Sequence, residues 1–255
     1  MLEVTILALL QGVAEFLPIS SSGHLVIAQN VLGVNESGMR LDVFLHLGTL
    51  VAIVVYYWRT ILHLAVPRRK EDLVYVAKII ISALPAVLFY FSFRGWIDSL
   101  FENAKMVGAL LMFTGAVVLG TRYLPRGGRD VSFLRAIMMG AAQAIALLPG
   151  VSRSGMTIAS ARAGRVDAAK AAEFSFLMSA PLIAGASLLE LVKSFSSATP
   201  AQGAIGWPLT LYGAAVAAVT GYFSLALLVK TLRGKGFWLF GAYCLAAGLL
   251  TLIML

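Results

Sequence analysis

Two short polar segments hold the residues of this chain that could do chemistry. The first reads Glu15-Phe16-Leu17-Pro18-Ile19-Ser20-Ser21-Ser22-Gly23-His24, and the second contains Ser152-Arg153-Ser154-Gly155. A serine becomes a nucleophile when a neighbouring base removes its proton, and either Glu15 or His24 could do so in the first segment. Arg153 carries a permanent charge and a planar set of donors that suits phosphate oxygens. The two segments therefore predict a phosphate site with a nucleophile beside it.

Each of these side chains also has a structural interpretation. Ser20, Ser21 and Ser22 could be helix caps, which is the commonest role of such a run. Arg153 could pair with Glu15 as a bridge between the two segments, and this pairing is compatible with a phosphate site that is empty. His24 alone would be a weak indication of a site, so it is the combination of residues that favours catalysis.

Glu15 follows Gln11 by four residues, so both side chains project from one face of a helix into the same pocket. A carboxylate there can hold a divalent cation or accept a proton. A capping role is disfavoured because Glu15 stands near the C-terminal end of its helix, where the helix dipole opposes negative charge. Asp42 and His46 share another helical face. We expect these two to be structural, with a supporting role at the site as the alternative.

The composition places these segments in a membrane protein. The chain has 255 residues, 60% of them hydrophobic and 13% charged, whereas soluble domains average about 45–50% and about 25%. The single cysteine, Cys244, excludes an internal disulfide and a cysteine-rich metal cluster. The net charge of +8 does not indicate nucleic acid, because no basic run is interleaved with aromatic residues. The basic residues instead predict the topology in the membrane.

Six regions are long enough to cross a hydrocarbon core of about 30 Å as single helices. They are 43–60, 73–93, 106–124, 171–192, 208–230 and 237–255. Two further apolar regions, 2–33 and 131–165, are interrupted in the middle by Pro, Gly and Ser residues. Each of these two is therefore predicted to be a pair of half-helices that enters the membrane and returns.

Lysine and arginine residues gather in four of the connections, which predicts that those connections are cytoplasmic. The residues are Arg59, Arg68, Arg69 and Lys70; Arg122, Arg126, Arg129 and Arg135; Arg162, Arg165 and Lys170; and Lys230, Arg233 and Lys235. The connections 33–42, 94–105 and 194–207 carry no net positive charge and are predicted to face outward. With these assignments, the hairpin 2–33 enters from outside and the hairpin 131–165 enters from the cytoplasm.

An internal repeat supports this topology. Placing Ser20-Ser21-Ser22-Gly23 on Ser152-Arg153-Ser154-Gly155 requires an offset of 132 residues, which also places Gln11 on Gln143 and the first three spans on the last three. We therefore predict an all-α polytopic membrane protein with an inverted-topology repeat. Residues 1–124 and 125–255 would each form a re-entrant hairpin and three spans within one membrane domain. Half-helices that start near Gly23 and Gly155 would then form an anion site near the midplane.

At these residues the chain resembles the bacterial undecaprenyl-diphosphatases, also called undecaprenyl pyrophosphate phosphatases or bacitracin-resistance proteins. The resemblance covers essentially the whole chain. Two long motifs carry it, Gln11-Gly12-Val13-Ala14-Glu15-Phe16-Leu17-Pro18-Ile19-Ser20-Ser21-Ser22-Gly23-His24 and Pro149-Gly150-Val151-Ser152-Arg153-Ser154-Gly155. It implies hydrolysis of undecaprenyl diphosphate to undecaprenyl phosphate and inorganic phosphate, which recycles the lipid carrier for cell-wall synthesis. It also implies a divalent cation, with Mg²⁺ expected and Ca²⁺ as the alternative.

The resemblance assigns roles to the matching residues. Ser21 corresponds to the family's proposed nucleophile, His24 to its proposed base and Arg153 to its phosphate-binding arginine. Gln11 and Glu15 match its Glu/Gln-x-x-x-Glu element and are the candidate metal ligands, although Gln11 supplies one carboxylate fewer than members with two. The expected phosphate-binding set consists of small and hydroxyl residues: Ser20, Ser22, Gly23, Ser152, Ser154, Gly155 and Thr157.

We expect Ser21 to attack the terminal phosphorus while Glu15 or His24 takes its proton. Arg153, the half-helix N-termini and Mg²⁺ would stabilise charge on the transferring oxygens. Two variants fit the same residues, with either His24 as the nucleophile or a metal-bound water that attacks directly. A transporter or flippase of a lipid phosphate is the alternative function, because opposed hairpins in an inverted repeat also occur in transporters.

The expected partners are the polyprenyl diphosphate lipid and the membrane, with no nucleic acid. The resemblance implies the bacterial inner membrane, with the site open to the outer, periplasmic face. Small residues of the later spans suit close helix packing and could also support a homodimer. They are Gly213, Gly221, Gly241 and Gly248.

Overall fold

The computed structural model describes residues 1–32, 38–125, 127–196, 205–234 and 236–255, which are helical apart from short turns and loops. Parts of the predicted outward connections 33–42 and 194–207, with Arg126 and Lys235, lie outside this description. The helices are α1 (Leu2–Phe16), α2 (Ser21–Leu32), α3 (Gly38–Tyr56), α4 (Trp58–Ala65), α5 (Lys70–Phe101), α6 (Ala104–Gly120), the 3₁₀ helix η1 (Thr121–Tyr123), α7 (Phe133–Ile145), α8 (Arg153–Ala163), α9 (Ala168–Ser196), α10 (Trp207–Arg233) and α11 (Leu239–Met254).

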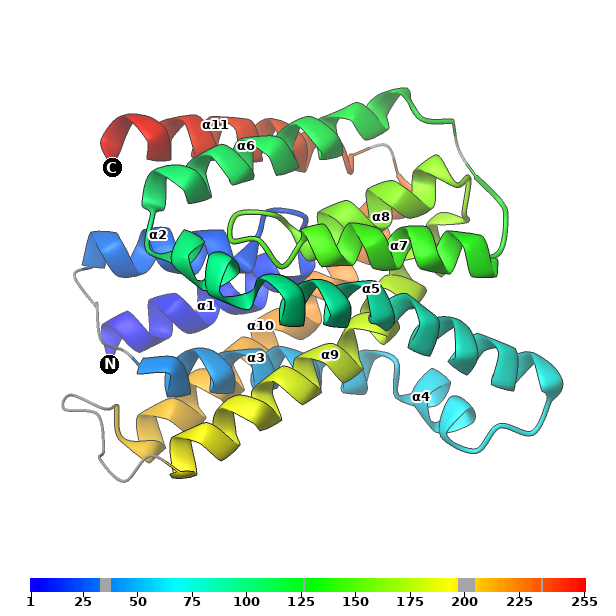
Figure 1. Cartoon of the computed structure of the whole chain (residues 1–255), viewed down its shortest axis with the longest axis horizontal. Coiled ribbons are helices and arrows are strands. Elements are labelled where there is room, and N and C mark those ends of the chain that lie inside the picture. The colour runs from blue at the N-terminus through cyan, green and yellow to red at the C-terminus, as the bar shows by residue number, and fades with distance from the viewer. Residues whose placement is uncertain (33–37, 126, 197–204, 235) are drawn as a thin grey trace.

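The same order of elements occurs twice along the chain. The hairpin α1–α2 is followed by α3 to α6, and the hairpin α7–α8 is followed by α9 to α11. Figure 1 shows that the two hairpins enter from opposite ends of the molecule and that their tips meet in the middle. The helices α9, α10 and α11 also run opposite to α3, α5 and α6 (Figure 1). The chain is therefore the all-α polytopic membrane protein that the sequence predicts, with opposed hairpins, while its division at residue 124 stays a prediction.

The helices of the two halves are packed into each other. The first helix of each hairpin packs chiefly on a long helix of the other half, α1 on α10 and α7 on α5, while α3 packs on α10 and α6 on α11. Apolar side chains from both halves fill the resulting core, among them Phe16, Phe176 and Leu225, which are all fully buried. This core fixes the two hairpin tips relative to each other.

Two of the six predicted spans differ in the structure. The region 43–60 is not one straight helix, because α3 and α4 meet at Tyr57 with a bend of 81°. The region 237–255 contains α11, which has only 16 residues. By length and apolar composition, four of the described helices can cross a membrane, or five if the bent pair counts as one span. The bend leaves α4 with one apolar and one polar face, as expected of a helix lying along the membrane surface.

The glycines that could have supported a homodimer are used inside the chain. A Cβ atom added to Gly241 of α11 would lie 2.4 Å from the backbone nitrogen of Leu119 in α6. At three further glycines an added Cβ atom would lie 2.6–3.0 Å from a neighbour within the chain, namely at Gly213, Gly221 and Gly248. These positions bring helices of one molecule together, so a homodimer would need a different surface.

Candidate active site

The tip of the first hairpin turns the chain so that Ser21 faces back toward Glu15. Helix α1 ends at Phe16, and Leu17 is extended, as the residue before a proline usually is. Ser20 adopts a positive φ of 67°, and its Oγ accepts a hydrogen bond from the Gly23 amide at 3.3 Å. Ser20 thus caps α2, as the structural interpretation expected, and this leaves the hydroxyl of Ser21 available for another partner.

The tip of the second hairpin positions Arg153 at the start of α8. The Oγ of Ser152 accepts a hydrogen bond from the Gly155 amide at 3.1 Å and so caps this helix. Thr114 of α6 holds the preceding turn with one hydroxyl, which donates to the Gly150 carbonyl at 2.9 Å and accepts from the Ser152 amide at 3.0 Å. Gly150 has a positive φ of 92°, which suits a residue without a side chain.

The two tips touch each other directly. A Cβ atom added to Gly23 would lie only 2.9 Å from the Cα atom of Gly150, so a side chain there would push the hairpins apart. The hydroxyl of Ser154 also donates to the Leu17 carbonyl at 3.2 Å, which ties the second tip to the first. The predicted meeting of the two polar segments is therefore a feature of the structure.

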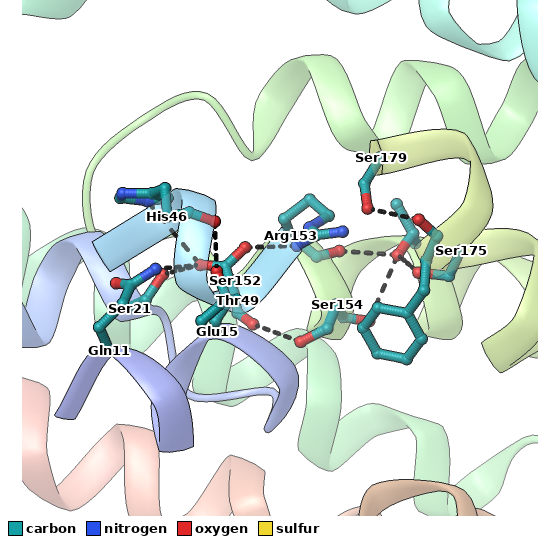
Figure 2. A network of polar contacts seen from close by, with 12 residues as sticks. Gln11, Glu15, Ser21, His46, Thr49, Ser152, Arg153, Ser154, Ser175 and Ser179 are labelled. Carbon is teal, nitrogen blue, oxygen red and sulfur yellow. Dashed lines mark hydrogen bonds and ion pairs between the residues drawn. The ribbon is translucent and has the colours of Figure 1, made fainter. Parts of the chain in front are cut away.

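Glu15 is the centre of the polar network between the hairpins, as Figure 2 shows. Its Oε2 accepts hydrogen bonds from Ser21 Oγ at 2.5 Å and from Gln11 Nε2 at 3.1 Å. Its Oε1 pairs with Nη2 of Arg153. The side chain of Glu15 is 7% exposed and that of Arg153 14% exposed, so the ion pair is largely shielded from water. The predicted bridge between the hairpins is thus present, and it includes the serine.

A cavity of about 420 Å³ opens beside this network. Six of the predicted site residues line it, Glu15, Ser20, Ser21, Ser22, Ser152 and Arg153. Its remaining wall is mainly apolar and includes Phe101, Leu182 and Ile183. The charged and hydroxyl groups of the wall can therefore take an anion, while its apolar part suits a hydrocarbon group.

His24 lies outside the cavity. Its Nδ1 is 2.9 Å from the Ser20 carbonyl oxygen, and its Nε2 is 2.7 Å from the hydroxyl of Tyr243 in α11. Both ring nitrogens therefore have partners other than Ser21. This arrangement holds the carbonyl of the cap residue and does not place His24 as a base for Ser21.

The other predicted phosphate-binding residues support the tips from behind. Thr157 is fully buried, donates to the Arg153 carbonyl at 2.7 Å and contacts the hydroxyl of Ser175 at 2.6 Å. Gly155 is buried against Ser152 and Val118. These residues do not line the cavity.

His46 and Asp42, which the sequence indicates to be structural, both line the cavity. The Nε2 of His46 lies 3.9 Å from Oε2 of Glu15, and its Nδ1 lies 2.7 Å from the Asp42 carbonyl oxygen. Their shared helical face was the signal in the sequence. The spacing could not show that this face points at Glu15.

The candidate metal ligands Glu15 and Gln11 lie side by side. No group of three or more His, Cys, Asp and Glu side chains within the described ranges could hold a metal ion. Gln11 turns its Nε2 toward Glu15, while its Oε1 is buried and has no hydrogen-bond partner. Mg²⁺ commonly takes one or two carboxylates and completes its shell with waters and substrate phosphates, so the one carboxylate of Glu15 leaves the predicted cation a prediction.

Comparison with known proteins places the whole chain in one group. The family model described as "Bacitracin resistance protein BacA" matches residues 4–250. The undecaprenyl-diphosphatase of Desulforapulum autotrophicum is 35% identical, over 97% of this chain and 96% of that protein. Those of Halothermothrix orenii and Desulfatibacillum aliphaticivorans are 34% and 36% identical, over 99% of this chain and 97% and 98% of theirs.

Proposed function

The chain belongs to the bacitracin resistance protein BacA family, and we propose that it removes the terminal phosphate of undecaprenyl diphosphate to give undecaprenyl phosphate and inorganic phosphate. The substrate follows from the names of relatives that match over nearly the full length of the chain. The cavity is consistent with it, because its wall combines charged and hydroxyl groups with a larger number of apolar side chains. The enzyme is a membrane phosphatase.

The observation that carries the mechanism is the hydrogen bond of 2.5 Å from Ser21 Oγ to Glu15 Oε2. A buried carboxylate that accepts the hydroxyl proton of a serine is arranged as its general base. Ser21 also lines the cavity, so its oxygen can reach a bound phosphate. This pair favours the phosphatase over a flippase, because moving a lipid phosphate requires the anion site but no activated serine.

Arg153 has one guanidinium nitrogen free for the substrate. Its Nη2 is held by Glu15, whereas its Nη1 is buried and has no hydrogen-bond partner. An oxygen of the terminal phosphate can therefore bind Nη1 without breaking the ion pair. The start of α8 adds backbone N–H groups at the same place, which favour negative charge. Charge that develops in the transition state would be stabilised by donors already in position.

The proposed reaction has two steps. Ser21 Oγ attacks the terminal phosphorus, its proton passes to Glu15, and the bond from that phosphorus to the bridging oxygen breaks. Undecaprenyl phosphate leaves and takes the proton from Glu15. Glu15 then accepts a proton from a water molecule that attacks the phosphoserine, and inorganic phosphate leaves as Ser21 recovers its hydroxyl. Mg²⁺, held by Glu15 and Gln11 Oε1, would neutralise charge on the diphosphate oxygens.

We further propose that the enzyme lies in the bacterial inner membrane with the cavity open toward the outer face. Asp42 near the start of α3 and Phe101 at the end of α5 both line the cavity. Those helix ends lie at the same end of the molecule as the N-terminus (Figure 1). The connections at that end are the ones without net positive charge, and the positive-inside rule assigns such connections to the outside.

The test is phosphate release by the purified protein in detergent, with farnesyl diphosphate as a soluble substrate and Mg²⁺ present. We expect one inorganic phosphate and one farnesyl phosphate for each diphosphate consumed. Absence of phosphate release from folded protein would overturn the enzymatic proposal. Transfer of a labelled lipid phosphate across liposomes by such an inactive protein would support the flippase instead.

A further inference from the structure

Gln143 is a buried amide with no partner. It lies in the last turn of α7, is 2% exposed, and lines the cavity that contains Ser21 and Arg153. Neither its Nε2 nor its Oε1 forms a hydrogen bond. Buried amides are nearly always hydrogen-bonded, because an unpaired one loses its water without compensation. A side chain in this state beside a cavity that also contains charged and hydroxyl groups points to a bound group that pairs with it.

The internal repeat explains why this glutamine is free. Gln143 is the counterpart of Gln11 in the other half, and Leu147 is the counterpart of Glu15. Gln11 donates its Nε2 to Glu15 across one turn at 3.1 Å. Leu147 offers no acceptor at the equivalent place. The Nε2 of Gln143 therefore stays unpaired, whereas the Nε2 of Gln11 is paired within the protein.

The surroundings of Gln143 select an anion as the missing partner. Arg153 lines the same cavity, and its Nη1 is also buried and without a hydrogen-bond partner. These two groups are unpaired N–H donors. The oxygens of an ionised diphosphate accept hydrogen bonds and donate none, so they are suitable partners. Serine hydroxyls on the cavity wall can adapt as donors to the same oxygens.

We infer that Gln143 is a substrate-binding residue whose amide N–H group donates to a diphosphate oxygen beside Arg153. Its Oε1 accepts a hydrogen bond from a water that accompanies the anion. This inference rests on the proposed phosphatase function and adds to it a contact from the second hairpin. The two glutamines of the repeat then have different tasks, since Gln11 holds Glu15 and Gln143 holds the ligand.

The test is the substitution Gln143→Met, which keeps an unbranched side chain of similar length and removes both hydrogen-bonding groups. The probe is methylenediphosphonate with Mg²⁺, a diphosphate analogue that cannot be hydrolysed, and its Kd is measured by calorimetry in detergent. We expect the Kd to rise at least about tenfold, which corresponds to one strong hydrogen bond. The KM for farnesyl diphosphate should rise in parallel.

A second measurement separates ligand binding from a structural role. The melting temperature of the ligand-free variant should stay equal or increase, because an unsatisfied buried amide has been replaced by an apolar group. A structural role predicts the opposite, a lower melting temperature with an unchanged Kd. Gln143→Leu provides a second variant with the same expected signs if the methionine side chain packs poorly.

Asn30→Leu is the control, because Asn30 lies on α2 outside the cavity wall, its amide donates to the Val26 carbonyl of its own helix, and its loss should leave the Kd within twofold. A Kd within twofold of wild type for both Gln143 variants would overturn the inference while the phosphatase activity stands. If wild-type protein neither binds the probe nor releases phosphate, the proposed function itself is overturned, and this inference with it.

Discussion

The hydroxyl of Ser21 donates to the carboxylate of Glu15 across a turn that reverses the chain, with 2.5 Å between Oγ and Oε2. The two residues belong to different half-helices of one hairpin, and the positive φ of Ser20 brings them together. Arg153 reaches the other oxygen of the same carboxylate from the second hairpin. In the proposed mechanism, the first hairpin thus supplies the nucleophile and base, and the second supplies the cation.

Ser21→Ala should lower turnover by roughly 10²–10⁴-fold, the range for loss of an activated group in proton and nucleophile chemistry. Phosphate release from farnesyl diphosphate measures it, and the melting temperature should stay near that of wild type. Ser22→Ala is the neighbouring comparison. Ser22 lines the cavity but contacts Ser20 and not Glu15, so its loss should be less than about tenfold. Turnover close to wild type in Ser21→Ala would exclude the serine as nucleophile.

Arg153→Lys should keep the charge and lose the function. One ammonium group cannot reproduce two guanidinium nitrogens, of which one binds Glu15 and the other is free for phosphate. We expect kcat/KM to fall by about 100-fold, equivalent to about 2.7 kcal/mol. Steady-state kinetics beside a thermal melt in detergent checks this. Retention of more than a third of the wild-type kcat/KM would show that the second nitrogen does not contact the substrate.

Thr114→Val should disturb the second hairpin from outside the cavity. The hydroxyl of Thr114 makes two buried hydrogen bonds to the turn before α8, and valine keeps its shape but makes neither. We expect a stability loss of about 1–3 kcal/mol per unsatisfied group, together with reduced turnover. Thr251→Val is the control, because the Thr251 hydroxyl donates only to Ala247 within its own helix. Equal melting temperatures for the two variants would contradict this account of the turn.

Chelation of divalent ions should stop turnover without lowering the thermal stability of the protein. Among the described residues, the candidate ligands are the Glu15 carboxylate and Gln11 Oε1, and no cluster of acidic, histidine or cysteine side chains could retain an ion alone. We therefore expect EDTA to abolish phosphate release, added Mg²⁺ to restore it, and the melting temperature of ligand-free protein to stay constant. A fall of several degrees on chelation would indicate a structural ion instead.

The hairpins and their meeting were predictable because local signals specify them. Pro18 and the serine run interrupt an apolar region, and the same interruption recurs 132 residues later near Arg153. The bend at Tyr57 was not predictable in this way, since the run 43–60 contains no proline and its glycine, Gly48, lies within α3. The apolar run continues past the bend to Trp58, so these residue types fit a straight helix equally well.

Hydrogen bonds between side chains far apart in the sequence were also not predictable. The hydroxyl that meets His24 belongs to Tyr243, which is 219 residues away. Thr114 likewise holds a turn in the other half, and nothing in its own neighbourhood distinguishes it from other helical threonines. Periodicity reports which face of a helix is buried, but it does not say which distant residue that face will contact.

The packing of α1 on α10 and of α7 on α5 also bears on how the protein is made. Helix α1 leaves the ribosome about two hundred residues before α10, so for most of synthesis it has only α2 and α3 as neighbours and lacks its chief partner. Helix α7, in contrast, finds α5 already in place. The packing of the first hairpin on α10 is therefore completed only after most of the chain has been made.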